Sequence, residues 1–307
     1  MSNFVFDLKC LPAEHPDISV ICINRNHEKY IEDTILSVLA QKFDNFEFLI
    51  ADGGSTDSSL DIIRQYPFIQ LVTGQDTCRE EGLLRALNAA RGRYVMVTTS
   101  TDGYLSRDWF KRAATILDQD SQVSLVFGGS AAMGSEGTLG AITYPVQFPF
   151  QEEQEKGRLS QLWLQYGLEA SYLPELNYCV RMEVFKQLMG PSSEFPTLND
   201  IDPILRFHFE FNRLGYISSY QPVLANFGRT HPNQAQISEK NNRYLRIYNE
   251  NWRNYRKSVM LGKLEHVFRD GNGNPIAKNK QTTINRLQLF LPRIPYFQIR
   301  QFIKNII

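Results

Sequence analysis

The 307-residue sequence predicts an α/β fold, with a mostly parallel sheet flanked by helices. Strand-like and helix-like patterns alternate over roughly 130 residues from Ile18 onward, which is typical of a parallel sheet with helices on both faces. Apolar residues make up 42% and charged residues 21%, the composition of an ordinary globular protein. The length suits one large domain or two modest ones.

The alternation starts from five runs of strand length that are rich in apolar and β-branched residues: 18–23, 46–51, 69–74, 93–99 and 123–129. Apolar residues at helical spacing occupy the intervals between these runs: 27–41, 57–66, 80–92 and 106–119. We expect Gly92 to end the third helix and Ser106 to be the N-cap of the fourth. Each strand is thus followed by a helix, as parallel neighbours in a sheet require.

The alternation stops near Ser130. The next twenty or so residues (130–150) are loop-rich and aromatic, which favours a binding surface over another crossover unit. Helices are predicted over 158–170, 182–190 and 202–215, whereas 216–228 predicts a strand pair or an edge strand broken at Pro222. We therefore divide the chain into a lead-in, an α/β domain with two halves, and a C-terminal extension: 1–17, 18–235 (18–129 and 130–235) and 236–307.

The composition excludes several classes of protein. With 33 basic and 33 acidic residues, the net charge gives no indication of a nucleic-acid partner, and we expect none. The four cysteines are scattered without a Cys-x-x-Cys pair, so neither a zinc site nor a disulfide framework is predicted. We find no signal peptide and no run near the ~20 apolar residues of a membrane span, so we expect a cytoplasmic protein.

Small polar residues follow the second predicted strand, where it gives way to a helix: Asp52, Gly53, Gly54, Ser55 and Thr56. A glycine-rich turn between a strand and a helix is where open α/β proteins hold nucleotides. Glycine lets the backbone turn sharply and approach a ligand, and a carboxylate can accept hydrogen bonds from a base or a ribose. The alternative is a solvated turn in which Ser55 or Asp57 only caps the helix, and we favour the cap for Asp57.

The stretch from Ile18 to Ile63 resembles the opening of the family-two glycosyltransferases, which have the Rossmann-like GT-A fold. The resemblance rests on "INRN" at the end of the first strand and on "ADGGSTD" after the second, with Gly53 at the second Asp of the usual motif. Later segments match further family elements in the expected order: 81–97, 199–216 and 224–234. The likeness extends from Ile18 to about Gln236.

In that family the loop after the second strand holds the nucleoside of a sugar-nucleotide donor. The resemblance implies this role for Asp52, Gly53 and Gly54. Further residues are assigned to the same donor side: Asn24, Arg25, Asn26 and Arg85. Arg25 can face the diphosphate, but a surface ion pair is an equal alternative.

The fourth strand ends where the family usually has a metal-binding Asp-x-Asp. Here Thr99, Ser100 and Thr101 occupy those positions, and Asp102 stands at the place of a trailing Asp. The resemblance implies Mn²⁺ or Mg²⁺ with Asp102 and His231 as ligands, because one carboxylate and a diphosphate can hold such an ion. It places four residues in the diphosphate region: Thr101, Asp102, Arg229 and His231. For residues 99–102 the alternative is a Thr/Ser-rich turn without a ligand. For Arg229 and His231 it is an ordinary surface loop.

Two aspartates precede the helix predicted over 202–215. Pro203 makes Asp202 a natural N-cap, which leaves Asp200 free ahead of the helix. The matching family residue is the general base that takes the proton of the acceptor hydroxyl, and the resemblance implies this role for Asp200. The alternative is that both acids only cap the helix. The remaining histidines, His27 among them, are expected to be structural or solvent-facing.

The resemblance implies an inverting glycosyltransferase. Its donor would be UDP-, GDP- or dTDP-linked, and its acceptor a saccharide or lipid-linked molecule in bacterial surface polysaccharide assembly. A degenerate GT-A binding or scaffold protein is one alternative, supported by the loss of Asp-x-Asp at Thr99–Thr101. A nucleotidyltransferase is another, but "INRNHEKY" lacks the glycines of its phosphate loop.

The C-terminal residues 284–307 combine basic and apolar side chains without an acid. Such a strip can contact an anionic membrane surface, here the inner face of the membrane. Packing onto the catalytic domain, or between the subunits of a homodimer, is the alternative.

Overall fold

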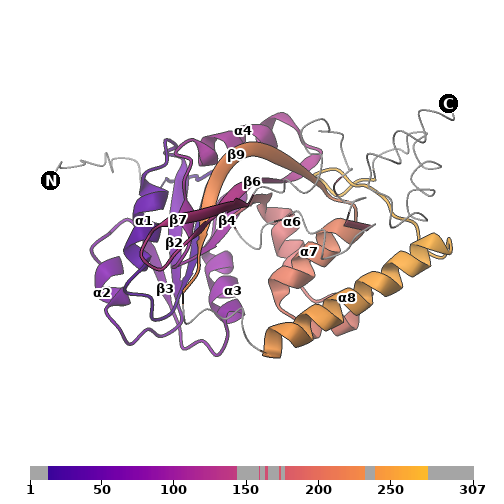
Figure 1. Cartoon of the computed structure of the whole chain (residues 1–307). Coiled ribbons are helices and arrows are strands. Elements are labelled where there is room, and N and C mark those ends of the chain that lie inside the picture. The colour runs from indigo at the N-terminus through magenta and orange to yellow at the C-terminus, as the bar shows by residue number, and fades with distance from the viewer. Residues whose placement is uncertain are drawn as a thin grey trace.

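The computed structural model describes residues 13–143, 159, 163–164, 173, 177–231 and 239–275 (Figure 1). Within these residues the strands form one nine-stranded sheet in the order β3-β2-β1-β4-β8-β6-β9-β5, with β7 paired to β6. The predicted helix over 158–170 and the strip over 284–307 fall mostly or wholly outside the described residues. No helix in the described part of the chain is both long and apolar enough to cross a membrane.

Four parallel strands form the first half of the sheet, as predicted: β1 (Ile18–Asn24), β2 (Phe46–Asp52), β3 (Gln70–Thr73) and β4 (Tyr94–Thr99). In their register, Asn24 of β1 lies beside Asp52 of β2, and Ile23 lies beside Thr99 of β4. The carboxyl ends of β1, β2 and β4 therefore lie at the same level along one edge of the sheet.

The second half of the sheet is mixed. The three-residue strand β8 (Cys179–Arg181) lies antiparallel between β4 and β6 (Val123–Met133). β9 (Ile217–Arg229) runs parallel to β6 and antiparallel to the short β5 (Gly103–Tyr104).

Two predictions for this half were only partly correct. The segment 130–150 is not only loop, because β6 extends to Met133 and pairs with β7 (Leu139–Thr143). The segment 216–228 is not a strand pair but part of one long strand, and the predicted break at Pro222 is an irregularity within that strand. The pairing of β6 with β9 shifts from Gly128–Gln221 to Gly129–Leu224, so Pro222 falls in an irregularity. Proline has no N–H to donate, and a bulge accommodates it without breaking the strand.

Helices cover both faces of the sheet, and the alternation of side chains along the strands fills both cores. In β4, Tyr94 and Met96 pack with α1 (Ile31–Leu39), α2 (Ser59–Ile63) and α4 (Trp109–Gln119). Val95 and Val97 point to the other face, with the remaining helices: α3 (Arg79–Ala89), α6 (Met182–Met189), α7 (Pro203–Arg213) and α8 (Glu239–Met260). Successive strand residues face opposite sides, so each strand contributes to both layers.

The predicted ends of two helices had different outcomes. Asp202 caps α7 as predicted, with its Oδ1 accepting a hydrogen bond of 2.8 Å from the backbone N of Ile204. Ser106 is not the N-cap of α4, which begins at Trp109 after Asp108.

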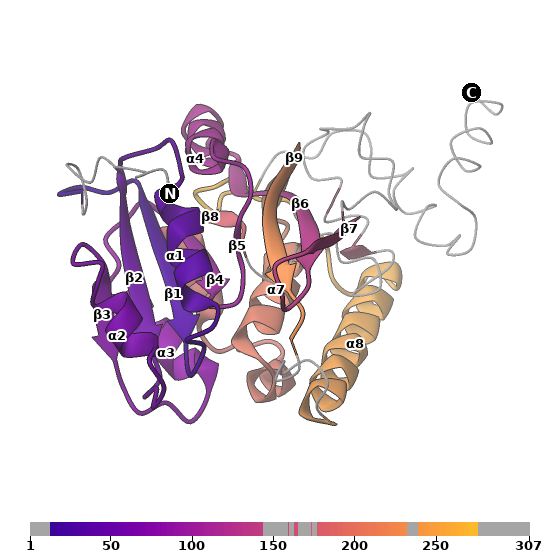
Figure 2. The same ribbon diagram turned by 60° about the vertical axis from the view of Figure 1, so that its left-hand side comes forward.

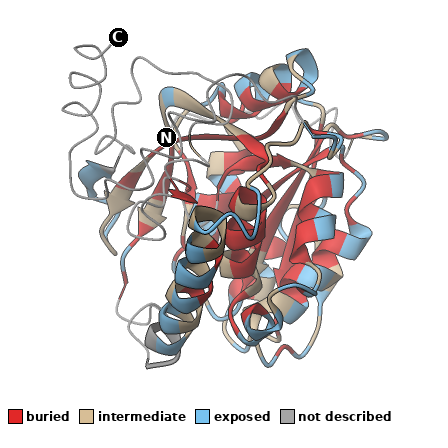
Figure 3. Cartoon of the chain, turned by 90° about the vertical axis from the view of Figure 1, so that its right-hand side faces the viewer, coloured by how far each residue is buried: buried red, intermediate tan, exposed pale blue. Residues whose placement is uncertain are grey.

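Helix α8 packs on the second core through one side only. Tyr248 and Tyr255 are buried, and the Tyr248 hydroxyl accepts a 2.8 Å hydrogen bond from Nε1 of Trp163. The Tyr255 hydroxyl donates to the carbonyl of Arg213 at 3.1 Å, which ties α8 to the end of α7. Exposed residues run along the rest of this helix, which crosses the front of the molecule in Figure 3.

Candidate functional site

The candidate site is built on the carboxyl edge of β1, β2 and β4, which Figure 2 shows side by side behind α1. The Nδ2 of Asn24 donates to Oδ2 of Asp52 at 2.7 Å and to Oγ of Ser55 at 3.2 Å. Both Asn24 and Asp52 are about 1% exposed. The two strand ends are therefore joined by their own side chains.

Asp52 organises the glycine-rich loop that follows β2. Its Oδ1 accepts hydrogen bonds from the backbone N of Gly54 at 3.0 Å and of Ser55 at 2.8 Å, and its Oδ2 accepts from the Ser55 hydroxyl at 2.7 Å. With Asn24 included, four donors occupy a carboxylate that has about four acceptor positions. Asp52 thus fixes the backbone of Gly53 and Gly54, the surface that sequence reasoning assigned to the nucleoside.

The loop after β1 is bonded to the same turn. Asn26 has a positive φ of 58°, and its Oδ1 accepts from the backbone N of Thr56 at 2.8 Å. Asp57 accepts from the backbone N of Ser59 at 3.0 Å and of Glu28 at 2.9 Å. The N-cap of α2 is Ser58, so Asp57 is not the cap that was predicted but binds the first residue of the helix from the position before the cap. Burial opposes ionisation of Asp57, but these hydrogen bonds outweigh it and hold the pKa of its carboxyl below the ordinary value.

Arg25 and Arg85 converge on Asp76, which the sequence gave no reason to select. Arg85 forms a two-pronged ion pair with the Asp76 carboxylate, both contacts being 2.7 Å, and Nη1 of Arg25 donates to the Asp76 carbonyl at 2.7 Å. The backbone of Gly74 lies against this pair, because a Cβ there would be 2.2 Å from Nη1 of Arg85. A Cβ on Gly53 would meet Oδ2 of Asp76 at 3.1 Å. Glycine therefore permits the close approach of this ion pair to the loop.

The loop after β4 is held through Asp102. Oδ2 accepts from the Thr99 hydroxyl at 3.0 Å, and Oδ1 accepts from the backbone N of Arg229 at 3.0 Å and the Thr101 hydroxyl at 3.4 Å. Asp102 thereby connects the end of β4 to the end of β9, two segments far apart in the sequence.

The Arg229 side chain is buried, with 2% of it exposed. Its Nη2 donates to Oδ2 of Asp33 at 2.7 Å, its Nε donates to the Thr101 carbonyl at 3.2 Å, and its guanidinium lies 4.8 Å from the centre of the Tyr30 ring. This geometry favours a role in positioning the Asp102 loop, whereas direct contact with a diphosphate stays a prediction.

Two histidines lie beside this loop. The rings of His27 and His231 make an edge contact with centroids 5.5 Å apart, and Nδ1 of His27 lies 2.7 Å from the Ser100 hydroxyl. Burial lowers the pKa of both imidazoles, and Arg229 lowers that of His231 further. Sequence reasoning selected His231 but missed His27, whose only signal was its position just after the first strand.

The described residues do not form a divalent metal site by themselves. Among them, no three His, Cys, Asp or Glu side chains come together in a group that could hold an ion. Asp102 is the carboxylate at the place of the usual motif, and its oxygens accept hydrogen bonds from Thr99, Thr101 and the Arg229 backbone. The pairing of Asp102 and His231 as metal ligands stays a prediction.

The two aspartates before α7 have different environments. Asp202 is buried, and its Oδ2 accepts from Nη2 of Arg79 at 2.6 Å and from Nε of the same residue at 3.0 Å. Asp200 ends the short 3₁₀ helix η3 (Pro196–Asp200) and is exposed. Asp200 is therefore accessible to an acceptor, as its proposed role requires.

The fold and these strand-end loops can be compared with those of known proteins. A family model described as "Glycosyl transferase family 2" matches residues 18–175, more than half of the chain. The chain belongs to glycosyl transferase family 2. This family membership confirms the resemblance inferred from the sequence motifs.

Two relatives within the family illustrate the extent of similarity. The putative teichuronic acid biosynthesis glycosyltransferase TuaG of Bacillus subtilis is 32% identical over 132 residues, which cover 40% of this chain and 50% of TuaG. An uncharacterized glycosyltransferase of Haemophilus influenzae is 22% identical over 319 residues, which cover 95% of each chain. The chain thus matches about half the length of TuaG and nearly all of the more distant relative.

The crystal structure of Staphylococcus aureus TarS resembles this fold with a TM-score of 0.53 at 18% identity, covering 81% of this chain and 41% of TarS. The structure of a truncated TarS in complex with UDP-GlcNAc has a TM-score of 0.50 at 17% identity. The match covers 75% of this chain and 64% of the truncated TarS. At such identities the likeness shows the fold alone. It confirms the predicted GT-A architecture for this family member.

Proposed function

We propose that the chain is an inverting glycosyltransferase, which moves a sugar from a nucleoside-diphosphate donor to a saccharide or lipid-linked acceptor. The main support is the arrangement at the sheet edge of a family 2 protein. There Asp52 fixes the backbone of the Gly53–Gly54 loop, next to Asn24 and the Arg85–Asp76 pair. Strand ends in open α/β sheets are where nucleotides bind.

In this proposal the nucleoside lies against the loop that Asp52 shapes. Because the carboxylate is occupied by internal donors, the backbone of Gly53 and Gly54 supplies the contact surface and Asp52 acts by holding it in place. The diphosphate lies toward the end of β4, near the hydroxyls of Thr99 and Thr101 and the imidazole of His27. The Nε2 side of the His27 ring can donate a hydrogen bond to a phosphate oxygen, whereas the hydroxyls of Thr99 and Thr101 already donate to Asp102 and hold the loop.

The transfer step is assigned to Asp200. Its carboxylate takes the proton of the acceptor hydroxyl while that oxygen bonds to the anomeric carbon, and the bond from that carbon to the diphosphate breaks. Attack from the side opposite the leaving group inverts the anomeric configuration. Asp202 cannot share the role easily, because it caps α7 and pairs with Arg79.

The comparisons support a donor and a setting for this proposal. The similar TarS structure contains UDP-GlcNAc, which favours a UDP-linked sugar. The names of TuaG and of TarS, a poly(ribitol-phosphate) β-N-acetylglucosaminyltransferase, refer to bacterial cell-wall polymers. We therefore propose a role in the assembly of a bacterial surface polymer.

The direct test is calorimetric titration of UDP, GDP and dTDP, with Mn²⁺ and with EDTA, followed by an assay of sugar-nucleotide hydrolysis. We expect one diphosphate to bind, and the corresponding sugar nucleotide to be turned over. Binding with no turnover across many acceptors would instead support the alternative of a non-catalytic GT-A protein, which the Thr99–Thr101 sequence favours. Absence of binding by all three would refute the proposal.

A further inference from the structure

A row of cations lies on the outer side of α8. Four exposed residues recur at intervals of three, seven and four positions along the helix: Arg243, Arg246, Arg253 and Lys257. Such spacing places side chains on one stripe of a helix. The opposite stripe carries Tyr248 and Tyr255, which are buried against the protein, so the cations face outward.

The charge of this helix departs from that of the chain as a whole. α8 contains six basic and two acidic residues, whereas the whole sequence contains 33 of each. Glu250 shares the outer stripe with the four cations, which leaves the stripe with a net positive charge. A one-sided positive surface of this kind attracts a polyanion.

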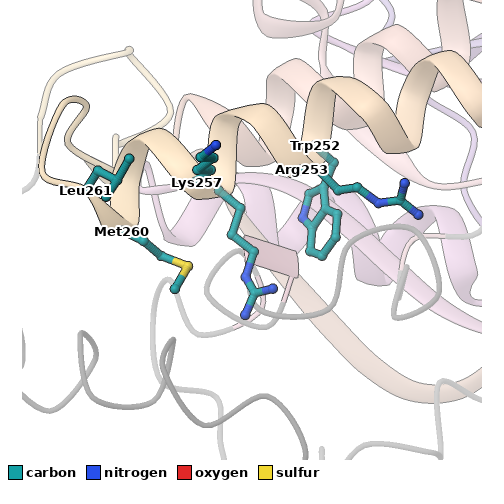
Figure 4. A pocket seen from close by; sticks show the side chains of 6 residues that line it. Trp252, Arg253, Lys257, Met260 and Leu261 are labelled. Carbon is teal, nitrogen blue, oxygen red and sulfur yellow. The ribbon is translucent and has the colours of Figure 1, made fainter.

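Apolar side chains accompany the cations at the C-terminal end of the stripe. In the described part of the chain, a cavity of about 240 Å³ is lined by Trp252, Arg253, Arg256, Lys257, Met260 and Leu261. Figure 4 shows Trp252 and Met260 projecting from the same side of α8. Leu261 is 60% exposed and Leu264 42% exposed. Exposed apolar side chains next to cations favour a binding partner that presents both negative charges and apolar groups.

The sequence beyond α8 argues against the chain's own tail as the occupant of this surface. Residues 271–307 contain six basic side chains and no acid. A basic segment is repelled by a basic stripe, whereas both are attracted to the same negative surface. The charges on the helix and on the tail are therefore complementary to an external polyanion.

We propose that the outer face of α8 docks the protein onto an anionic phospholipid bilayer, with the four cations contacting headgroup phosphates and Leu261 entering the interfacial region. Each cation near an anionic leaflet strengthens binding by roughly fivefold. The proposal does not depend on the proposed transferase activity, because vesicle binding is measured without donor or acceptor. Failure of one proposal therefore leaves the other intact.

The test is co-sedimentation of the full chain with vesicles of phosphatidylcholine alone or mixed with phosphatidylglycerol. We expect binding to the anionic vesicles only, and weaker binding as salt is raised. The double variant Arg253→Gln/Lys257→Gln should bind about 25-fold more weakly. The matched control is Lys111→Gln/Arg112→Gln, which removes two exposed cations from α4 and should leave binding within about twofold of the unmodified chain.

Three outcomes would overturn the proposal. The first is equal binding to neutral and anionic vesicles, or equal loss in the α4 control. The second is loss of binding when the tail cations Arg286, Arg293, Arg300 and Lys304 are changed to Gln, with no effect of the α8 pair. The third is a combination of two results: Leu261→Ser binds vesicles as well as the unmodified chain does, and dextran sulfate binds the protein through Arg253 and Lys257. That combination would identify a soluble polyanion as the ligand.

Discussion

Arg79 and Asp202 join the two halves of the protein through a short ion pair. Arg79 is the first residue of α3, Asp202 is the N-cap of α7, and Nη2 lies 2.6 Å from Oδ2. The same carboxylate accepts the backbone N–H of Ile204 through its other oxygen at 2.8 Å. One buried side chain therefore both starts α7 and fixes its position relative to α3 in the first half of the domain, residues 18–129.

We expect Asp202→Ala to destabilise the protein by about 1–3 kcal/mol, because it removes a helix cap and leaves a partly buried guanidinium without this partner. Urea unfolding monitored by circular dichroism measures the change. The control is Asp61→Ala, which removes an exposed i,i+3 partner of Arg64 and should cost less than about 0.5 kcal/mol. Equal losses in the two variants would contradict the structural role of Asp202.

Asp200→Asn should abolish sugar transfer while nucleotide affinity and stability stay unchanged. Asp200 is exposed, and an amide cannot accept the proton of the acceptor hydroxyl. We expect transfer to fall by at least about a hundredfold, within the range that general bases contribute. A radiolabelled transfer assay and nucleotide titration on the same preparation measure both quantities. Retained activity would mean that another group is the base.

Asp52→Asn should weaken binding of the nucleoside diphosphate by about tenfold or more, because the amide replaces one acceptor oxygen with a donor and disturbs the loop at Gly54 and Ser55. Asp57→Asn is the matched control, since Asp57 accepts two backbone hydrogen bonds in the same turn but outside the proposed contact surface. Isothermal calorimetry compares the two. An unchanged dissociation constant for Asp52→Asn would remove the nucleoside assignment.

His27→Gln should weaken binding of the diphosphate but leave binding of the free nucleoside unchanged. The imidazole holds Ser100 at the position of the usual metal motif and packs against His231. We expect a loss of about tenfold to a hundredfold, the size of one hydrogen bond to a charged group. His15→Gln changes an exposed histidine elsewhere and should have no effect. A parallel loss of nucleoside binding would indicate a distorted loop instead.

Stability should fall as the pH decreases from about 6.5 to about 4, in part because of His208. This histidine is 3% exposed, and burial lowers its pKa to about 4, with Asp202 opposing and Arg79 adding to the shift. The unfolded chain takes up a proton near pH 6.5 while the folded chain does not, so acid favours unfolding by up to about 1.4 kcal/mol per pH unit. Unfolding curves of His208→Gln should depend less steeply on pH over this interval. An unchanged slope would exclude His208 as a source of acid sensitivity.

The sequence allowed the parallel half of the sheet to be predicted because β1, β2 and β4 are mostly apolar runs of six or seven residues. The cap at Asp202 followed from Pro203 and was confirmed. β8 was not predictable, because three residues carry no periodicity and their place between β4 and β6 depends on pairing across the fold.

Side-chain environments were harder to predict than strands. Arg229 looked like a ligand-facing cation, yet it is buried beside Asp33, nearly two hundred positions away in the chain. His27 lacked a partner in the sequence because its partners, Ser100 and His231, come from other strand ends. Motifs therefore predicted the residues of the candidate site, whereas the contacts among them depend on tertiary structure.

The position of β8 has a consequence for synthesis of the protein on the ribosome. β4 is complete at Thr99, but the strand that covers its outer edge ends only at Arg181, and β9 completes the sheet at Arg229. A nascent chain that emerges at about 5–20 residues per second therefore exposes an unpaired, apolar strand edge for several seconds. Truncated translation products that stop before β8 should aggregate, and chaperones that bind exposed strands should associate with them.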